Sequence, residues 1–360
     1  MPDPTAGSRG LLCIEATMTS RPITLALNGF GRIGRTILRI LAAAGNDDLE
    51  IVLINDIEPL ESCAYLFEYD SVFGPFRGSV ETRPGMLVVD GRAIPFHSVR
   101  DIAALDLSGV DVVLECTGHN DDRETVERGL RAGAGSVLIS GPSKVADATL
   151  VLGANADRLG DERVISNASC TTNALAPLLK VLNEAFGVVS GQMTTVHCYT
   201  GSQPTVDKPR GDAARSRAAA LSMVPTTTSA GRLIGMVLPE LAGRIEARAI
   251  RVPTASVSAI DLTVATERSA SVDAVNALLR DMAATSPVFG WIDRPLVSSD
   301  LRARPESIVV AGPETSLAGG LLRVFGWYDN EWGFSCRMLD MARMIARRNH
   351  QGRETPHVER

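Results

Sequence analysis

The octet Ser166-Asn167-Ala168-Ser169-Cys170-Thr171-Thr172-Asn173 contains the residue best suited to covalent chemistry. A short apolar run before it is typical of a buried strand, and leucines at helical spacing follow it. Cys170 therefore falls near a helix N-terminus, where unpaired N–H groups and the helix dipole favour negative charge. We expect its thiol to lose a proton readily and to act as a nucleophile. The alternative is a small buried hydrophobic residue, which is a common role for cysteine.

A possible base for this thiol lies further along the chain. The segment Gln192–Thr200 has the β-branched and aromatic composition of a strand. Alternation along a strand places His197 and Cys198 on opposite faces. Thiol chemistry needs a base within hydrogen-bond reach, so we expect Cys170 and His197 to form a pair, although a lone histidine is more often structural.

A second motif predicts a site for a dinucleotide. Its glycines form G-x-G-x-x-G between a predicted strand at 23–27 and a predicted helix, and Asp56 ends the next strand, about 20 residues beyond the last glycine. Such glycines let the backbone approach a pyrophosphate at the helix N-terminus, and the acid binds ribose hydroxyls and repels a 2′-phosphate. We therefore expect NAD as the cofactor, against the alternative of a tight turn without a ligand. The predicted binding residues are Asn28, Gly29, Phe30, Gly31, Arg32, Ile33, Gly34 and Asp56.

Further strands are predicted at 111–116 and 136–140, with a helical stretch around 125–132 between them. This alternation of strands and helices indicates a parallel sheet with right-handed crossovers. Ligands bind beyond the carboxyl ends of such strands, where Thr117, Gly118 and Ser140 follow them. These three residues are equally typical of ordinary turns.

Candidate anion sites lie in the second half. The segment Gly201–Ala220 is polar and rich in arginine, and a loop of this length is usually functional or disordered. A cluster of hydroxyl residues follows at 226–229, and Arg251 precedes another predicted strand. Guanidinium groups match phosphate geometry, so arginines beside hydroxyls indicate anion binding.

The composition limits the class of protein. The chain has 360 residues and 45% hydrophobic residues, as is ordinary for a soluble globular protein, and its net charge of -6 argues against general nucleic-acid binding. Its six cysteines form no C-x-x-C pair, as expected for a reducing compartment, and we predict a cytoplasmic protein without a metal site. No apolar run reaches the roughly 18 residues of a membrane helix, so no membrane partner is expected. Residues 1–20 lack the order of a signal peptide and are predicted to be a disordered extension, with Met18 as a possible alternative start.

Several segments together resemble the glyceraldehyde-3-phosphate dehydrogenase family. The resemblance implies an α/β protein with an N-terminal Rossmann-type parallel-sheet domain at 21–169. An α+β catalytic domain with a mixed sheet would follow at 170–333, then a C-terminal helix at 334–350 that returns to the first domain. It also implies a homotetramer. The matching segments occur in the family's order and are Asn28–Arg35, Ser166–Asn173, Met193–Thr200, Pro225–Thr228, Arg251–Thr254 and Trp327–Gly333.

The resemblance also implies residue roles. Cys170 would be the nucleophile, with His197 as its base and proton shuttle. Asn330 would contact the nicotinamide carboxamide, and the loop at 201–220 would lie beside a neighbouring subunit's cofactor. The substrate phosphate would bind Thr200 and Arg251, and the attacking inorganic phosphate would bind Ser169, Thr171, Thr228 and Arg215.

The implied function is phosphorylating oxidation of glyceraldehyde 3-phosphate by NAD to 1,3-bisphosphoglycerate, through a thioester on the cysteine. One alternative is the related erythrose-4-phosphate dehydrogenase, which hydrolyses the thioester. Another is a dinucleotide-sensing protein without catalysis, which would need neither Cys170 nor His197. The chain departs from the family pattern at Ala174, Ser202, Ser229 and Lys208, where the family often carries Cys, Asp, Gly and Leu.

Overall fold

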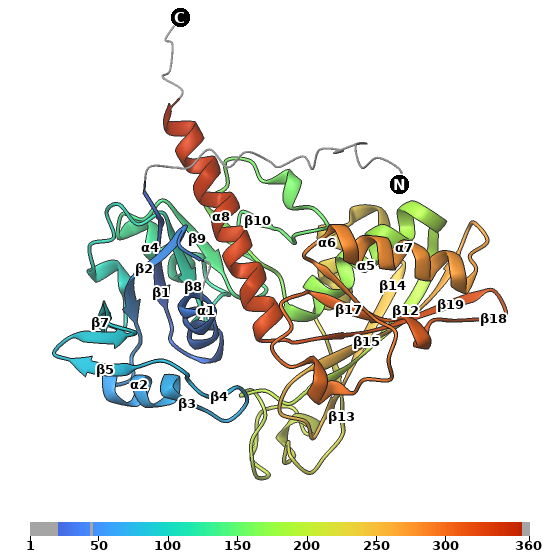
Figure 1. The fold of residues 1–360 in the computed structure, drawn as a ribbon, viewed down its shortest axis with the longest axis horizontal. Coiled ribbons are helices and arrows are strands. Elements are labelled where there is room, and N and C mark those ends of the chain that lie inside the picture. Colours follow the sequence, from blue (N-terminus) through green and yellow to red (C-terminus); the bar gives the residue numbers. More distant parts are fainter. Residues whose placement is uncertain (1–20, 44–45, 355–360) are drawn as a thin grey trace, which may run out of the picture.

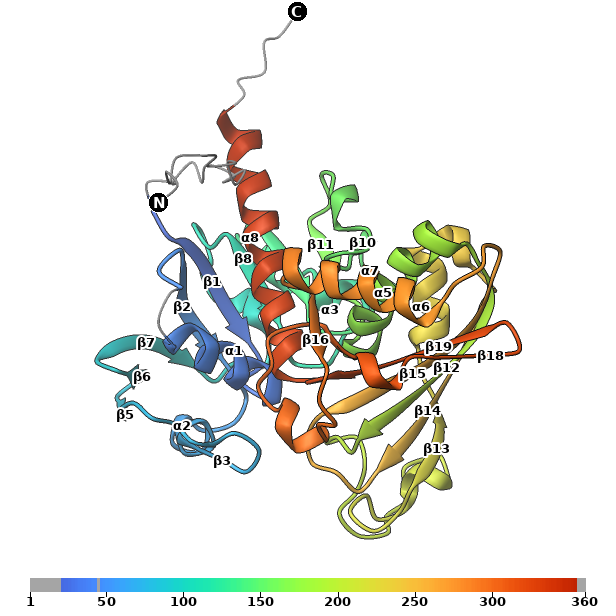
Figure 2. The same ribbon diagram turned by 45° about the vertical axis from the view of Figure 1, so that its right-hand side comes forward.

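The structure is a computed structural model that describes residues 21–43 and 46–354. Two large β-sheets lie side by side, each with its own helices, and a long C-terminal helix runs along the first sheet (Figures 1 and 2). The predicted extension at 1–20 lies outside the described residues. Within the described ranges, no helix is long and apolar enough to cross a membrane.

The first sheet carries the predicted dinucleotide site. Its strands run in the order β10-β11-β9-β8-β1-β2-β7-β6-β5, and the pairs from β10 to β7 are parallel. The sequence order reverses at β1, and ligands of such sheets bind where this reversal opens a crevice. The strands are β1 (Ile23–Asn28), β2 (Leu49–Asn55), β5 (Val80–Arg83), β6 (Met86–Val89), β7 (Arg92–His97), β8 (Val112–Glu115), β9 (Ser136–Ile139), β10 (Ala148–Thr149) and β11 (Val164–Ser166).

Helix α1 (Arg32–Ala42) follows β1 after a short loop and buries Ile37 and Leu38 in the core of the first sheet. The predicted helical stretch around 125–132 is two short helices, which meet at Glu127. The other elements of this part are α2 (Leu60–Glu68), β3 (Tyr69–Asp70), β4 (Gly74–Pro75), η1 (Ile102–Ala104), α3 (Arg123–Val126), α4 (Arg128–Arg131) and η2 (Ala156–Arg158).

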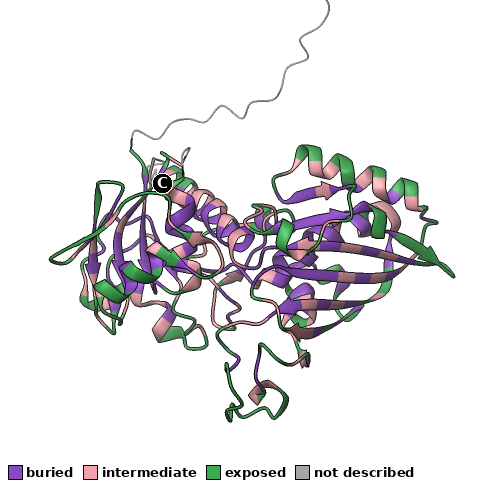
Figure 3. Cartoon of the chain, turned by 60° about the horizontal axis from the view of Figure 1, so that its bottom comes forward, coloured by how far each residue is buried: buried purple, intermediate pink, exposed green. Residues whose placement is uncertain are grey.

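The second sheet is mixed and has the order β13-β14-β12-β15-β19-β17-β16, with β18 paired to β19. Helices α5, α6 and α7 pack their apolar residues on one face of this sheet. Residues of β14 alternate between buried and exposed, whereas those of β17 are all buried (Figure 3). This α+β arrangement agrees with the predicted fold class. The strands are β12 (Val188–Cys198), β13 (Val224–Thr227), β14 (Ile245–Val252), β15 (Ser258–Thr266), β16 (Phe289–Ile292), β17 (Ile308–Ala311), β18 (Ser316–Ala318) and β19 (Leu321–Tyr328).

The helices of this second part begin with α5 (Cys170–Phe186), which links the two sheets by following directly after β11. The long helix α8 (Trp332–Glu354) follows β19 and returns to the first sheet, where it packs against α1, β8 and β9 (Figure 1). Its Met338, Met341 and Ile345 lie in the core of the first sheet. The remaining helices are η3 (Ala214–Ser216), α6 (Ala230–Val237), η4 (Pro239–Leu241), α7 (Val272–Thr285), η5 (Ser298–Leu301) and η6 (Gly312–Glu314).

Candidate active site

Cys170 is the first residue of α5, and a tight turn after β11 places it there. Ala168 in this turn is fully buried and has a φ of 56°, a conformation that is uncommon for residues with a side chain. Ser169 caps the helix, because its Oγ accepts a hydrogen bond of 3.1 Å from the backbone N–H of Thr172. Asn173 closes the turn by donating to the carbonyl oxygens of Asn167 and Ser169, at 2.7 and 3.1 Å. The positive φ of the buried Ala168 is a local backbone strain of the kind that is typical of functional sites.

His197 faces the thiol from the end of β12. Its Nε2 lies 3.6 Å from Cys170 Sγ, and its Nδ1 lies 2.7 Å from the carbonyl oxygen of Cys198. In the tautomer whose Nδ1 donates its proton to this carbonyl oxygen, Nε2 is free to accept a proton from the thiol. The imidazole is therefore oriented as a base for the thiol.

Arg251 reaches the same histidine because β12 and β14 are parallel and pair His197 with Arg251 in register. Its Nη1 donates to the Cys198 carbonyl oxygen at 3.0 Å and lies 2.9 Å from Nδ1 of His197. When Nδ1 carries the proton, both N–H groups share this carbonyl oxygen as acceptor and do not bond to each other. The proposed substrate-phosphate ligand thus contacts the proposed base in this structure.

The electrostatics of the pair follow from burial. Burial, followed by the charge of Arg251, lowers the pKa of His197 from its ordinary 6.5 to about 4. Burial also raises the pKa of the Cys170 thiol, and Arg251 opposes this rise only in part. The expectation of a lowered thiol pKa from the helix start alone is therefore wrong for this structure, because desolvation outweighs the helix N-terminus. At neutral pH the pair is a neutral thiol beside a neutral imidazole.

Tyr328, at the end of β19, is a site residue that sequence reasoning missed. Its hydroxyl lies 2.9 Å from Thr171 Oγ1 and 2.8 Å from Thr195 Oγ1, and its ring meets the His197 ring edge to face. Tyr328 is only 2% exposed, so its ring packs against the His197 ring on the side that faces the protein interior. The segment at 327–333 is one of those that resemble the family, but no pattern in the sequence predicts that Tyr328 contacts residues on α5 and β12.

Three of the predicted anion ligands, Thr200, Arg215 and Thr228, form side-chain hydrogen bonds with residues close to them in the sequence. Thr200 lies beside Ser202, with their hydroxyl oxygens 2.9 Å apart. Arg215 donates to Thr226 Oγ1 at 2.6 Å and to Thr227 Oγ1 at 3.2 Å, whereas the Thr228 hydroxyl accepts from the backbone N–H of Ala230. The structure therefore joins Arg215 to the two neighbouring threonines and not to Thr228.

The glycine-rich loop between β1 and α1 has the geometry of a phosphate cradle. Gly29 has a φ of 95°, and a Cβ on Gly34 would lie 2.3 Å from the Gly29 carbonyl oxygen, so both positions require glycine. Gly31 is exposed, and a Cβ there would meet no atom within 4 Å. The loop therefore leaves open space at the start of α1, where a pyrophosphate binds in dinucleotide folds.

The side chains of the loop have different surroundings. Phe30 is buried in the core against Phe67 and Phe96, so only its backbone faces the loop. The Phe30 N–H donates to Asp56 Oδ2 at 2.5 Å, and the Glu58 N–H donates to Oδ1 at 3.0 Å. Asp56 is thus held at the carboxyl end of β2, where we predict that it binds the ribose.

Glu115 is a second residue that the sequence did not reveal. It is buried at the end of β8 and accepts hydrogen bonds from Asn28 Nδ2 at 2.6 Å and from the Thr117 N–H at 3.0 Å. Burial raises its pKa. Glu115 therefore joins the loop to the exposed Thr117 and Gly118, and the Ser140 N–H bonds its carbonyl oxygen at 2.9 Å.

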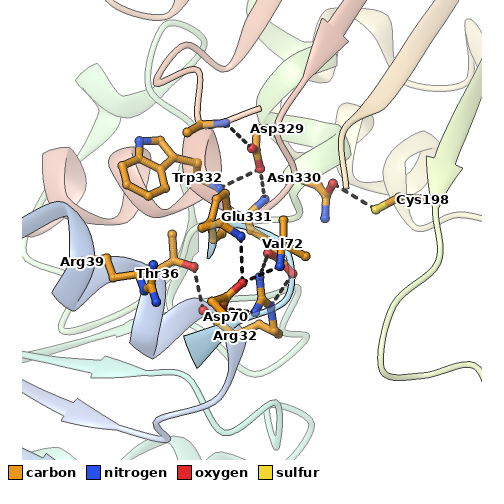
Figure 4. Close-up of polar contacts among 12 residues, drawn as sticks. Arg32, Thr36, Arg39, Asp70, Val72, Cys198, Asp329, Asn330, Glu331 and Trp332 are labelled. Atoms are coloured by element: carbon orange, nitrogen blue, oxygen red, sulfur yellow. Dashed lines mark hydrogen bonds and ion pairs between the residues drawn. The ribbon is translucent and has the colours of Figure 1, made fainter. Parts of the chain in front are cut away.

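The loop is also tied to the segment that carries Asn330 (Figure 4). Arg32 forms an ion pair with Asp70 and a bidentate ion pair with Glu331. In the latter, Nε donates to Oε1 at 2.9 Å and Nη2 donates to Oε2 at 2.5 Å. Ile33 packs against the core of the first sheet. Within the described ranges, no group of three or more His, Cys, Asp or Glu side chains is arranged to hold a metal ion.

A parallel sheet with an open glycine loop, together with a half-buried cysteine beside a buried histidine, is typical of a dinucleotide-dependent dehydrogenase. The glyceraldehyde 3-phosphate dehydrogenase NAD-binding domain matches residues 23–123, and the C-terminal domain of the same family matches residues 169–330. The chain belongs to the glyceraldehyde-3-phosphate dehydrogenase family and is an NAD-dependent oxidoreductase.

Curated relatives are similar over nearly their whole length. The glyceraldehyde-3-phosphate dehydrogenase of Xanthobacter flavus is 47% identical over 89% of this chain and 97% of its own. That of Pseudomonas aeruginosa is 47% identical over 90% of this chain and 98% of its own. The Geobacillus stearothermophilus enzyme is 43% identical with the same coverage, 90% and 98%.

Proposed function

We propose that this protein is a phosphorylating glyceraldehyde-3-phosphate dehydrogenase that works through a thioester on Cys170. The observation that carries the proposal is the thiol at the start of α5, 3.6 Å from the free Nε2 of a buried, neutral His197. A nucleophile and an oriented base within hydrogen-bond reach are the requirement for covalent catalysis.

The first half of the reaction begins with proton transfer from the thiol to Nε2 of His197. The Cys170 sulfur then bonds to the aldehyde carbon, and the resulting alkoxide takes the proton from His197 to give a hemithioacetal, which leaves Nε2 free again. Bound NAD supplies the acceptor for the hydride of that carbon. His197 removes the hydroxyl proton in this step, which leaves an acyl thioester on Cys170. Such acid–base assistance contributes about 10²–10⁴-fold.

The second half needs two anion sites. We assign the substrate phosphate to Thr200 and Arg251. Arg251 contacts Nδ1 of His197, whereas the thiol lies beside the other ring nitrogen, Nε2. We assign the attacking phosphate to Ser169, Thr171, Thr228 and Arg215, with Thr226 and Thr227 as the direct partners of Arg215. An oxygen of inorganic phosphate attacks the thioester carbon, the C–S bond breaks, and 1,3-bisphosphoglycerate leaves. The Cys170 thiolate then takes the proton that His197 holds, which restores the neutral thiol and imidazole.

We also propose a cytoplasmic homotetramer with domain boundaries at 21–169, 170–333 and 334–350. Support for assembly comes from the segment between β12 and β13, which extends away from the second sheet (Figures 1 and 2). It carries Val206, Leu221 and Met223 with 72%, 84% and 74% of their surface exposed. Large apolar residues gathered on one exposed segment are typical of an interaction site.

We assign Asn330 to the carboxamide of the bound nicotinamide, as the family resemblance implies. The proposal is tested by measuring reduced-cofactor formation with glyceraldehyde 3-phosphate and with erythrose 4-phosphate, each with and without inorganic phosphate. We expect sustained turnover only with glyceraldehyde 3-phosphate and phosphate together. Full turnover in phosphate-free buffer, with erythrose 4-phosphate as the better substrate, would instead establish the hydrolytic activity.

A further inference from the structure

The side chain of Asn330 is held by two residues with no assigned role. Asn330 follows β19, is 7% exposed, and its Oδ1 lies 3.1 Å from Cys198 Sγ and 3.4 Å from Ser258 Oγ. Figure 4 shows Cys198 reaching Asn330 from the end of β12, on the opposite side from Arg32 and Glu331. Both partners are buried, at 1% exposed each.

The direction of these two bonds is fixed by the donors. Burial raises the pKa of the Cys198 thiol to about 12, so the thiol keeps its proton and donates it. Ser258 Oγ already accepts the backbone N–H of Cys198 at 3.2 Å, which leaves its own proton for Asn330. Two donors therefore face Oδ1, and the amide of Asn330 is oriented with Nδ2 on the other side. Among the described residues, none accepts a hydrogen bond from that Nδ2.

The backbone of Asn330 is equally fixed. Asp329 Oδ1 accepts the N–H groups of Glu331 and Trp332, at 3.0 and 2.9 Å, and so starts α8. Glu331 in turn holds Arg32, the first residue of α1 after the glycine loop. Asn330 therefore lies between the cofactor loop and the strand that carries His197, and its Nδ2 amide group is unpaired among the described residues (Figure 4).

We propose that Cys198 and Ser258 are positioning residues that fix the Asn330 amide, so that its Nδ2 donates to the carboxamide oxygen of the nicotinamide. This inference rests on the proposed function, in which Asn330 is the carboxamide contact. A fixed donor selects one orientation of the carboxamide and hence of the ring. Without the two hydroxyl and thiol donors, the amide is free to turn and loses this selection.

A binding cycle tests the positioning role without turnover. NAD binding to the cofactor-free protein is measured by calorimetry for wild type, the Cys198→Ala/Ser258→Ala variant, Asn330→Ala, and all three changes together. We expect the first variant to weaken NAD about 3- to 10-fold, as for the loss of one hydrogen bond, and to have no further effect in the Asn330→Ala background. Cys198→Ser keeps a donor and should bind within about twofold of wild type. Cys336→Ala, at a half-buried cysteine on α8, is the control.

Binding of 3-acetylpyridine adenine dinucleotide tests the direction of the bond, because this analogue keeps the carbonyl oxygen and lacks the amide N–H. Asn330→Ala should weaken NAD and the analogue by the same factor if Nδ2 is the donor. Weakening of NAD alone would overturn the assigned direction. An equal effect of Cys198→Ala/Ser258→Ala in both Asn330 backgrounds would overturn the positioning role. If Asn330→Ala itself left NAD binding unchanged, the proposed carboxamide contact would be the part that fails.

Discussion

Two helices of this protein begin directly after a parallel strand, and their first turns are built in opposite ways. The start of α1 has no side-chain cap, and the exposed Gly31 leaves space beside it. The start of α5 is capped by Ser169 and begins with the half-buried Cys170 thiol. The uncapped start leaves its N–H groups for a ligand's phosphates, whereas the capped start presents a nucleophile.

This difference explains which property of each site depends on the backbone. The α1 site is formed by the backbone. Glycine is required at Gly29 by its positive φ and at Gly34 because a Cβ atom would clash with the Gly29 carbonyl oxygen. The α5 site depends on the charges and solvation of a few side chains, because burial rather than the helix start decides the direction of the Cys170 pKa. Changes at the first site should therefore alter folding and cofactor affinity, and changes at the second should alter rate.

The largest effect is expected at the second site, from His197→Asn. We expect kcat to fall about 10²–10⁴-fold with little change in NAD affinity, since the side chain acts on protons and not on the cofactor. The pKa of about 4 means that His197 stays neutral above pH 5, so no loss of activity near pH 6.5 should come from this residue. Steady-state rates across pH, with calorimetric NAD binding, check both statements.

The same histidine makes stability depend on pH. Its folded pKa lies below the ordinary 6.5, so the unfolded chain takes up the proton first as pH falls, and stability is lost progressively from about pH 6.5 to about 4. At pH 5 this loss amounts to about 2 kcal/mol. Urea unfolding at pH 7 and pH 5 should show a larger drop for wild type than for His197→Asn. Equal drops would contradict the buried neutral histidine.

The next effect separates the two roles of the glycines at the first site. Gly34→Ala forces a Cβ to within 2.3 Å of the Gly29 carbonyl oxygen, so we expect a loss of about 3 kcal/mol in the free energy of unfolding. Gly31→Ala meets no protein atom and should leave the unfolding of the cofactor-free protein unchanged. It should nevertheless weaken NAD binding, because its methyl group occupies the space beside the uncapped helix start. If both variants unfolded alike, the loop would not be organised as described.

Much of this contrast could be predicted from the sequence. The glycine spacing and the strand and helix periodicities predict the α1 site, since its geometry is local in the chain. The α5 site depends on strand register, which pairs His197 with Arg251 across β12 and β14. The contacts of Tyr328 with Thr171 and of Cys198 with Asn330 join residues more than a hundred positions apart, and no local pattern encodes them. The helix start alone predicts the wrong direction for the pKa of Cys170, because burial is a property of the tertiary structure.

A smaller effect is expected where side chains alone bind an anion. Arg215→Ala should raise the half-saturating phosphate concentration about tenfold or more, since a hydrogen bond to a charged group is worth about 1.5–3 kcal/mol. Ser229→Gly should lower that concentration, because it restores space beside the proposed site. Phosphate titrations at saturating aldehyde check both changes. An unchanged half-saturation in Arg215→Ala would remove Arg215 from the phosphate site.

The smallest effect concerns the choice between NAD and NADP. Asp56 is fixed by two backbone N–H groups and would face a 2′-phosphate, so we expect higher catalytic efficiency with NAD. The exposed Lys208 opposes this preference only weakly because solvent screens its charge. Lys208→Leu should sharpen the NAD preference by a few-fold, and Asp56→Ala should reduce it. Higher efficiency with NADP in wild type would show that Lys208 outweighs Asp56.

The thiol at the start of α5 is tested most directly by a single-turnover experiment in phosphate-free buffer. Mixing enzyme, NAD and glyceraldehyde 3-phosphate should give a burst of reduced cofactor of at most one equivalent per chain, and intact mass analysis should find the 3-phosphoglyceryl group on Cys170. Added phosphate should release the adduct and restore steady turnover, and Cys170→Ala should show neither burst nor adduct while still binding NAD. Steady turnover without phosphate and without an adduct on Cys170 would contradict the thioester mechanism.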